Sequence, residues 1–144
     1  MKFIAIDYGK KKMGIALSDG LGSMAFAKNV LPYSCLSRVL DDIVTICTHN
    51  KVEGVVVGVP LYKDGSMSPL AHEVYSFVSK LYTKFTAQYF IINEYLSSFM
   101  AKTIAPSTMK QPYVDAYSAK VILDDFLALS QEQRMTCRFS GDRE

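Results

Sequence analysis

The chain has 144 residues, of which 49% are hydrophobic and 21% are charged, and its formal net charge is +2. This length suits one ordinary domain, and the composition excludes global disorder and a long coiled coil. The longest apolar runs are far shorter than the roughly 18 residues that a membrane-spanning helix needs, so we expect no membrane association. An acidic residue already stands at position 7, which leaves no room for a secretory signal and predicts a cytoplasmic protein.

The first part of the chain predicts three strands. Residues 3–7 are apolar up to a final aspartate, and residues 13–18 repeat that apolar character after a turn that contains Gly9. This pattern predicts an antiparallel hairpin of two central strands. Residues 24–31 predict a third strand, and Pro32 ends it.

Helical and strand patterns alternate through the rest of the chain. Apolar residues recur at helical spacing over residues 34–49, from about 70 to 85, and over 114–129. Residues 55–59 and 89–92 have the continuous apolar character of buried parallel strands, and a further helix is expected to open at Glu94. The resulting order, β-β-β-α-β-α-β-α-α, predicts an α/β fold with one mixed sheet, in which an antiparallel hairpin precedes parallel strands and helices cover both faces.

We expect one domain over residues 1–129, followed by a polar and frayed tail over residues 130–144. The three cysteines, Cys35, Cys47 and Cys137, have no CxxC spacing, and only two histidines accompany them. This pattern predicts that the cysteines are reduced and mostly buried, and it does not support a zinc site.

Three carboxylates stand at the ends of apolar elements. Asp7 ends the first strand, Glu94 follows the strand at residues 89–92, and Asp115 begins an apolar helical stripe. That stripe continues through Ala119, Ile122 and Phe126. Each carboxylate alone could cap a turn or stabilise a helix N-terminus. Gathered at one sheet edge they would repel one another unless cations lay between them, and oxygen ligands favour Mg²⁺ or Mn²⁺.

A run of three lysines, Lys10, Lys11 and Lys12, follows Asp7 in the predicted hairpin turn. On composition alone such a run is equally well a solvated turn or a phosphate-binding element. The net charge of +2 is too small to decide between these two interpretations.

Four motifs in order resemble the bacterial Holliday-junction-resolvase-like family, also described as the pre-16S rRNA nuclease family, within the RNase H-like superfamily. They are FIAIDYGKKKMGIALSD at residues 3–19, VGVP at 57–60 with DGS at 64–66, NE at 93–94, and VDAYSA at 114–119. The resemblance extends from residue 2 to about residue 128, which is nearly the whole chain. It implies a single RNase H-like domain.

The resemblance also implies an activity, namely metal-dependent hydrolysis of nucleic-acid phosphodiesters, with processing of the 5′ end of pre-16S rRNA as the preferred role. It implies that Asp7, Glu94 and Asp115 hold two Mg²⁺ (or Mn²⁺) ions and carry catalysis. The lysine run at residues 10–12 would then neutralise neighbouring phosphates. The expected partner is precursor rRNA or branched DNA, and the protein is expected to be a monomer or a homodimer.

The sequence departs from the family pattern at three positions near the predicted site. Tyr95 stands where the family has an arginine after its glutamate, Lys12 replaces an arginine, and Asn93 replaces an aspartate. A lysine keeps the positive charge but cannot hold a phosphate through a planar fork. We therefore expect a retained metal site with an altered grip on the substrate.

Three alternatives stay open at this point. The chain could be a Holliday-junction DNA resolvase, or a non-catalytic nucleic-acid or ribosome-assembly module that keeps the fold, which the missing arginine favours. An Asp-x-Gly turn after a first strand, as at residues 7–9, also occurs in actin-like ATPases and sugar kinases. Those proteins place two such domains around a nucleotide, and 144 residues cannot supply both.

Overall fold

The structure, a computed structural model, describes residues 1–62, 64–93 and 111–141, and for residues 111–115 it describes the backbone alone. Its elements, in chain order, are β1 (Phe3–Asp7), β2 (Lys12–Ser18), β3 (Ala25–Pro32), α1 (Leu36–His49), β4 (Gly54–Val59), α2 (Pro69–Lys84), β5 (Gln88–Asn93), α4 (Gln111–Leu127), α5 (Gln131–Thr136) and β6 (Arg138–Phe139). In this part of the chain, none of the helices is long and apolar enough to cross a membrane.

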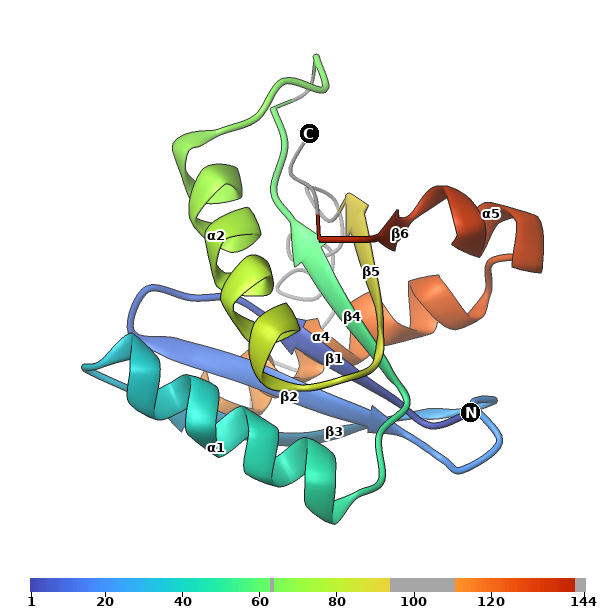
Figure 1. The fold of residues 1–144 in the computed structure, drawn as a ribbon, viewed down its shortest axis with the longest axis horizontal. Helices are drawn as coiled ribbons and strands as arrows, with labels where there is room; N and C mark the ends of the chain where they lie inside the picture. The colour runs from blue at the N-terminus through green and yellow to red at the C-terminus, as the bar shows by residue number, and fades with distance from the viewer. Residues whose placement is uncertain (63, 94–110, 142–144) are drawn as a thin grey trace.

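One six-stranded sheet, in the order β3-β2-β1-β4-β5-β6, forms the centre of the molecule (Figure 1). The strands β1, β2 and β3 pair in antiparallel fashion, β1, β4 and β5 pair in parallel, and β6 is antiparallel to β5. The predicted hairpin and the predicted mixed sheet are therefore confirmed. Because β1, β4 and β5 run in the same direction, their carboxyl ends lie at the same edge of the sheet.

The helices α1 and α2 cover one face of this sheet (Figure 1). Alternate residues of the strands, such as Ile4 and Ile6 of β1, are fully buried there against the apolar stripes of the two helices. Val39 and Ile43 represent the stripe of α1, and Phe77 represents that of α2. The helical spacing read from the sequence thus describes this layer correctly.

The helix α4 covers the opposite face and packs against β1, β2 and β3. Phe3 and Ala5 of β1 point to this side, where they join the buried residues Ala119, Ile122 and Phe126 of α4. The rings of Phe3 and Phe126 meet edge to face with centroids 5.2 Å apart. The apolar stripe predicted for the last helix is confirmed, and it faces the sheet.

The predicted fraying of the tail is wrong for residues 131–139, which form α5 and β6. Ser130 accepts a hydrogen bond from the amide of Gln133, and the Gln133 side chain accepts one from the Ser130 amide, so a capping box starts α5. Phe139 is buried, and β6 pairs with β5. The polar composition did not predict this ordered structure, because one buried ring and one added strand are enough to hold the segment.

Two smaller predictions are also wrong. The helical spacing predicts a last helix from residue 114, but α4 spans Gln111–Leu127 and includes Pro112. Cys35, expected to be buried, is exposed at the start of α1, whereas Cys47 is buried as predicted. None of the three cysteines forms a disulfide in the structure.

Candidate functional site

The carboxyl ends of β1, β4 and β5 form the edge at which the sequence predicts an acidic site. Asp7 is the last residue of β1 and is partly buried, and it pairs with Gly14 of β2. In the neighbouring strands, Val59 ends β4 in register with Asn93, which ends β5. Adjacent strands are spaced by about 4.8 Å, so β1 and β5 lie about 10 Å apart at this edge.

Asp7 follows Phe3 and Ala5 on the same side of β1, which is the side that α4 covers. The backbone of α4 places Asp115 one helical turn before the buried Ala119. The strand that ends in one predicted ligand thus packs against the helix that contains another.

Glu94 and the side chain of Asp115 lie outside the described residues, so their meeting with Asp7 stays a prediction. Within residues 1–62, 64–93 and 111–141, no three side chains of His, Cys, Asp or Glu gather as a metal site would require. The described residues therefore contribute one ligand candidate, Asp7, to the predicted group.

The β1–β2 turn carries the lysine run beside this edge. Lys10 and Lys11 are exposed, whereas Lys12 is the first residue of β2 and is partly buried. A Cβ atom on Gly9 would clash with the main-chain oxygen of Lys12, so the tight course of this turn requires glycine. The sequence placed this glycine in the turn, and the structure supplies the reason.

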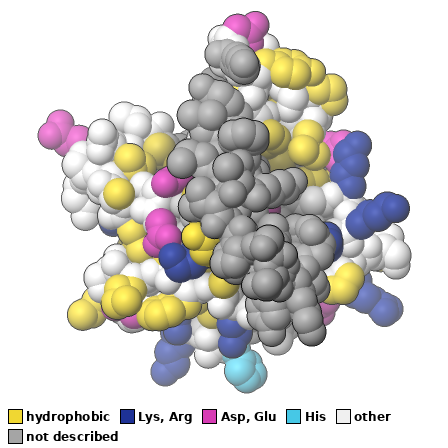
Figure 2. Space-filling model, turned by 180° about the vertical axis from the view of Figure 1, so that it is seen from behind, with side chains coloured by type: hydrophobic (Ala, Val, Ile, Leu, Met, Phe, Trp, Pro, Cys, Tyr) yellow, Lys and Arg dark blue, Asp and Glu magenta, His cyan; other side chains and the backbone are white. Residues whose placement is uncertain are grey.

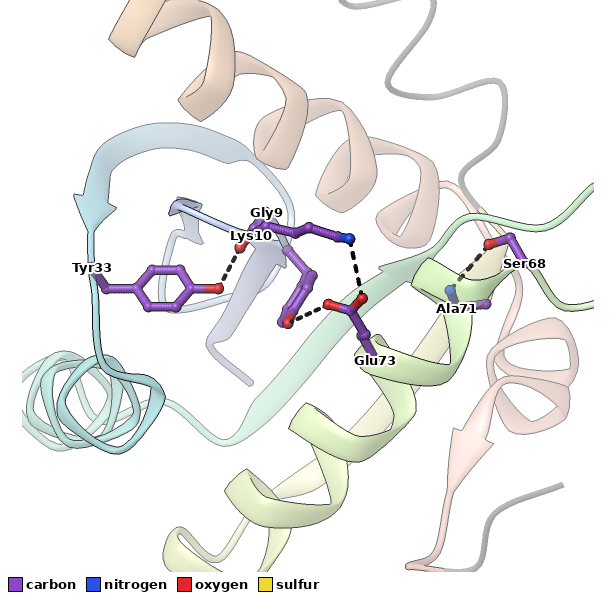
Figure 3. Close-up of polar contacts among 7 residues, drawn as sticks. Gly9, Lys10, Tyr33, Ser68, Ala71 and Glu73 are labelled. Carbon is purple, nitrogen blue, oxygen red and sulfur yellow. Dashed lines mark hydrogen bonds and ion pairs between the residues drawn. The ribbon is translucent and has the colours of Figure 1, made fainter.

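Tyr33, which follows β3, fixes the same turn from the side. Its hydroxyl donates a hydrogen bond of 2.6 Å to the carbonyl oxygen of Gly9 (Figure 3), and its amide donates one of 2.9 Å to the carbonyl oxygen of Lys11. Two contacts from one residue thus hold the backbone from which the lysines project.

Glu73 of α2 reaches the turn from the helix layer. One carboxylate oxygen, Oε1, accepts a hydrogen bond of 3.2 Å from the Tyr8 hydroxyl, and the other, Oε2, lies 3.4 Å from the ammonium nitrogen of Lys10 (Figure 3). The Tyr8 ring packs against Phe77 with centroids 5.4 Å apart. Burial, together with the neighbouring Tyr33 and Glu73, raises the pKa of Tyr8, so its hydroxyl stays protonated and donates.

The start of α2 is tied to the same edge of the sheet. Ser68 caps the helix by accepting a hydrogen bond of 3.1 Å from the Ala71 amide (Figure 3), and its hydroxyl donates one of 2.8 Å to the carbonyl oxygen of Pro60. Pro60 directly follows β4, so this cap fixes the first turns of α2, and with them Glu73, relative to the strand ends.

Sequence reasoning missed Glu73 and Tyr33 because neither belongs to a recognised motif. Glu73 gave no distinct signal, because it lies at the edge of the apolar stripe of α2, next to the buried Val74 and one turn before Phe77. Two other acids, Asp19 and Asp64, occupy turns. Asp19 accepts hydrogen bonds from the Ser23 and Met24 amides, and the Asp64 carboxylate accepts them from Ser66.

On the face opposite to that of Figure 1, the visible lysine and arginine side chains lie in separate groups, most of them at the margin and several beside acidic side chains (Figure 2). This spread agrees with the small net charge of +2.

The sheet order and the helices on both faces define an RNase H-like fold, and solved structures agree. The structure titled "T. thermophilus RuvC in complex with Holliday junction substrate" superimposes with a TM-score of 0.59 at 12% sequence identity, covering 96% of this chain and 98% of that one. A second Thermus thermophilus RuvC structure gives a TM-score of 0.57 at the same identity and coverage. At this identity the likeness concerns the fold.

The family is shown by sequence. The RuvX family, described as Holliday junction resolvase, matches residues 1–129. A protein of Nitratidesulfovibrio vulgaris named "Putative pre-16S rRNA nuclease" is 32% identical over 93% of this chain and 98% of its own length. One of the same name from Oleidesulfovibrio alaskensis is 31% identical over 94% of this chain and 97% of its own length. The chain belongs to the RuvX family.

Proposed function

We propose that this chain is a divalent-metal-dependent nuclease whose reaction centre is the sheet edge formed by the carboxyl ends of β1, β4 and β5. Family membership supports the coarser statement that the protein is a hydrolase of nucleic-acid phosphodiester bonds. The observation that carries the finer proposal is the position of Asp7, which ends a central strand on the side that α4, the helix of Asp115, covers.

The donor set fits a hard divalent cation. Asp7, Glu94 and Asp115 offer only carboxylate oxygens, which suit Mg²⁺ or Mn²⁺ rather than zinc. Glu94 directly follows Asn93, the last residue of β5 at the same edge. We propose that these three residues hold two such ions, which, when bound, supply the Lewis acidity that phosphodiester hydrolysis needs. The chain's own part is to present its carboxylates at a fixed edge of the sheet.

The β1–β2 turn, called the lysine turn from here on because it carries Lys10, Lys11 and Lys12, would orient the nucleic acid at this edge. Lys10 and Lys11 are exposed on a turn that directly follows Asp7, so a strand whose phosphate lies at the carboxylates would run close to them. Lysine binds phosphate as a point charge without reading bases, which suits contact with the backbone of any sequence. We propose Lys10, Lys11 and Lys12 as the nucleic-acid contacts.

We propose precursor 16S rRNA as the substrate, because the relatives that cover nearly the whole chain carry that name. The proposal includes the cytoplasm as the location, since ribosomal RNA is processed where ribosomes assemble. The name of the matching family keeps four-way-junction DNA as the second candidate. Replacement of the family arginine by Tyr95 keeps a non-catalytic binding module as the third.

The test is cleavage of labelled precursor 16S rRNA and labelled four-way-junction DNA, side by side, with Mg²⁺, Mn²⁺ or a chelator. We expect metal-dependent cutting of the RNA that Asp7→Asn and Asp115→Asn abolish while RNA binding is retained. Asp19→Asn, which changes a turn aspartate in the same way, is the matched control and should cut normally. Cutting of the junction alone would transfer the substrate to DNA, and binding without cutting by the unaltered protein would establish the non-catalytic module.

A further inference from the structure

Glu73, an acidic residue of α2, contacts the lysine turn from the helix layer. Its Oε2 lies 3.4 Å from the Lys10 ammonium nitrogen, and its Oε1 accepts the Tyr8 hydroxyl hydrogen bond of 3.2 Å. The two oxygens therefore have separate duties. The hydrogen bond to Oε1 holds the carboxylate in place, and Oε2 faces the Lys10 side chain, which is 70% exposed (Figure 3).

The carboxylate is held more firmly than the lysine that it pairs with. Glu73 lies in the second turn of α2, whose start is fixed to the end of β4 by Ser68, and its Tyr8 donor is packed against Phe77. Lys10 has a flexible stem on an exposed turn. A phosphate that approached Lys10 would therefore meet a fixed negative charge already in contact with the ammonium group.

We propose that Glu73 is a positioning residue that holds Lys10 away from the nucleic-acid backbone and thereby weakens the protein's grip on its substrate. This inference rests on the proposed function of the lysine turn. A carboxylate that competes with phosphate for one lysine limits affinity without affecting base recognition, because neither partner reads a base. Such a limit favours release of product after the strand is cut.

The size of the effect follows from the exposure of the pair. Ion pairs between side chains as exposed as these are weak and screened by salt, so removing the Glu73 charge should tighten binding by about two- to fivefold. If Lys10 then contacts a phosphate, the dependence of log affinity on log salt should become steeper by about 0.7 for single-stranded RNA.

The experiment measures binding of a short fluorescent single-stranded RNA by the full chain, in chelator so that no strand is cut, from about 50 to 200 mM salt. Glu73→Gln keeps an oxygen that can accept the Tyr8 hydrogen bond and removes the charge. Asp41→Asn is the matched control, because it makes the same charge change and breaks the pair of Asp41 with Lys84, about 16 Å further along α2. We expect tighter binding and a steeper salt slope for Glu73→Gln and wild-type binding for Asp41→Asn.

The same change in a Lys10→Ala background isolates the contact between the two residues, as in a double-mutant cycle. There Glu73→Gln should leave both affinity and salt slope unchanged. A gain that persists without Lys10, or a gain equal to that of Asp41→Asn, would overturn the inference while leaving the proposed function intact. If the wild-type chain binds this RNA without salt dependence, the lysine turn is no phosphate contact, and both this inference and the proposed role of Lys10, Lys11 and Lys12 fail. Thermal melting of each variant checks the fold, and Glu73→Asp, which shortens the reach to Lys10, should give a smaller gain.

Discussion

The glycine of the lysine turn offers a sharp test of how this hairpin is built. In Gly9→Ala the added methyl group would clash with the carbonyl oxygen of Lys12, which is a backbone atom and cannot rotate away. The turn must shift, although Tyr33 holds it through the carbonyl oxygens of Gly9 and Lys11. Either the added strain remains, or these contacts are lost.

Overpacking and local backbone strain each cost on the order of 1–3 kcal/mol. We expect Gly9→Ala to lower the free energy of unfolding by about that amount, which corresponds to a fall in melting temperature of about 3–10 °C for a chain of this size. Urea unfolding should show a lower midpoint at an unchanged m-value, since the surface exposed on unfolding does not change.

Gly20→Ala is the matched control. Gly20 lies in the loop between β2 and β3, and a Cβ atom there would meet nothing within 4 Å. The same substitution should be neutral or stabilise by about 0.4–1 kcal/mol, because alanine restricts the unfolded chain. Equal stability of the two variants would refute the explanation, since it would mean that the close approach to Lys12 does not constrain the turn.

Three further predictions concern other parts of the molecule. The exposed Cys35 should react with a thiol reagent in the native protein, whereas Cys47, whose burial raises its pKa to about 12, should react only on unfolding; peptide mass mapping distinguishes them. Hydrogen bonds from the Met24 amide and its neighbours lower the pKa of Asp19 to about 2, so the stability of this loop should be complete above about pH 4 and lost as the pH falls through about 2, as amide hydrogen exchange would report. Phe139→Ala should lower the free energy of unfolding by about 3 kcal/mol in urea titrations, and full stability would mean that the β6 segment is only loosely attached.

The strands and helices could be predicted from the sequence wherever a residue pattern was compatible with only one structure. A strand made of the continuous apolar residues 55–59 needs both of its faces buried, and β4, which lies between β1 and β5, has both faces buried. The stripe of Ala119, Ile122 and Phe126 likewise required a helix with one face on the sheet.

The segment after α4 was not readable in this way because its stability comes from distant partners. Phe139 is buried through the pairing of β6 with β5 and an edge-to-face contact with Tyr82 of α2, with ring centroids 5.6 Å apart. The local capping box at Ser130 was the one signal in the sequence itself. A short element whose core residues lie elsewhere in the chain appears polar when only its own composition is considered.

The candidate site divides along the same line. Asp7 could be selected from the sequence because an acid at the end of an apolar strand needs a special reason to be there. Glu73 could not, because an acid on the edge of a helix is ordinary until the fold brings it to Lys10 and Tyr8, 63 and 65 residues earlier in the chain. Asp7 departs from the apolar pattern of its strand, whereas Glu73 conforms to the pattern of its helix and is distinguished only by what it contacts. This is why the carboxylates proposed as metal ligands were predicted from motifs, whereas the contact of Glu73 with the lysine turn was found only in the structure.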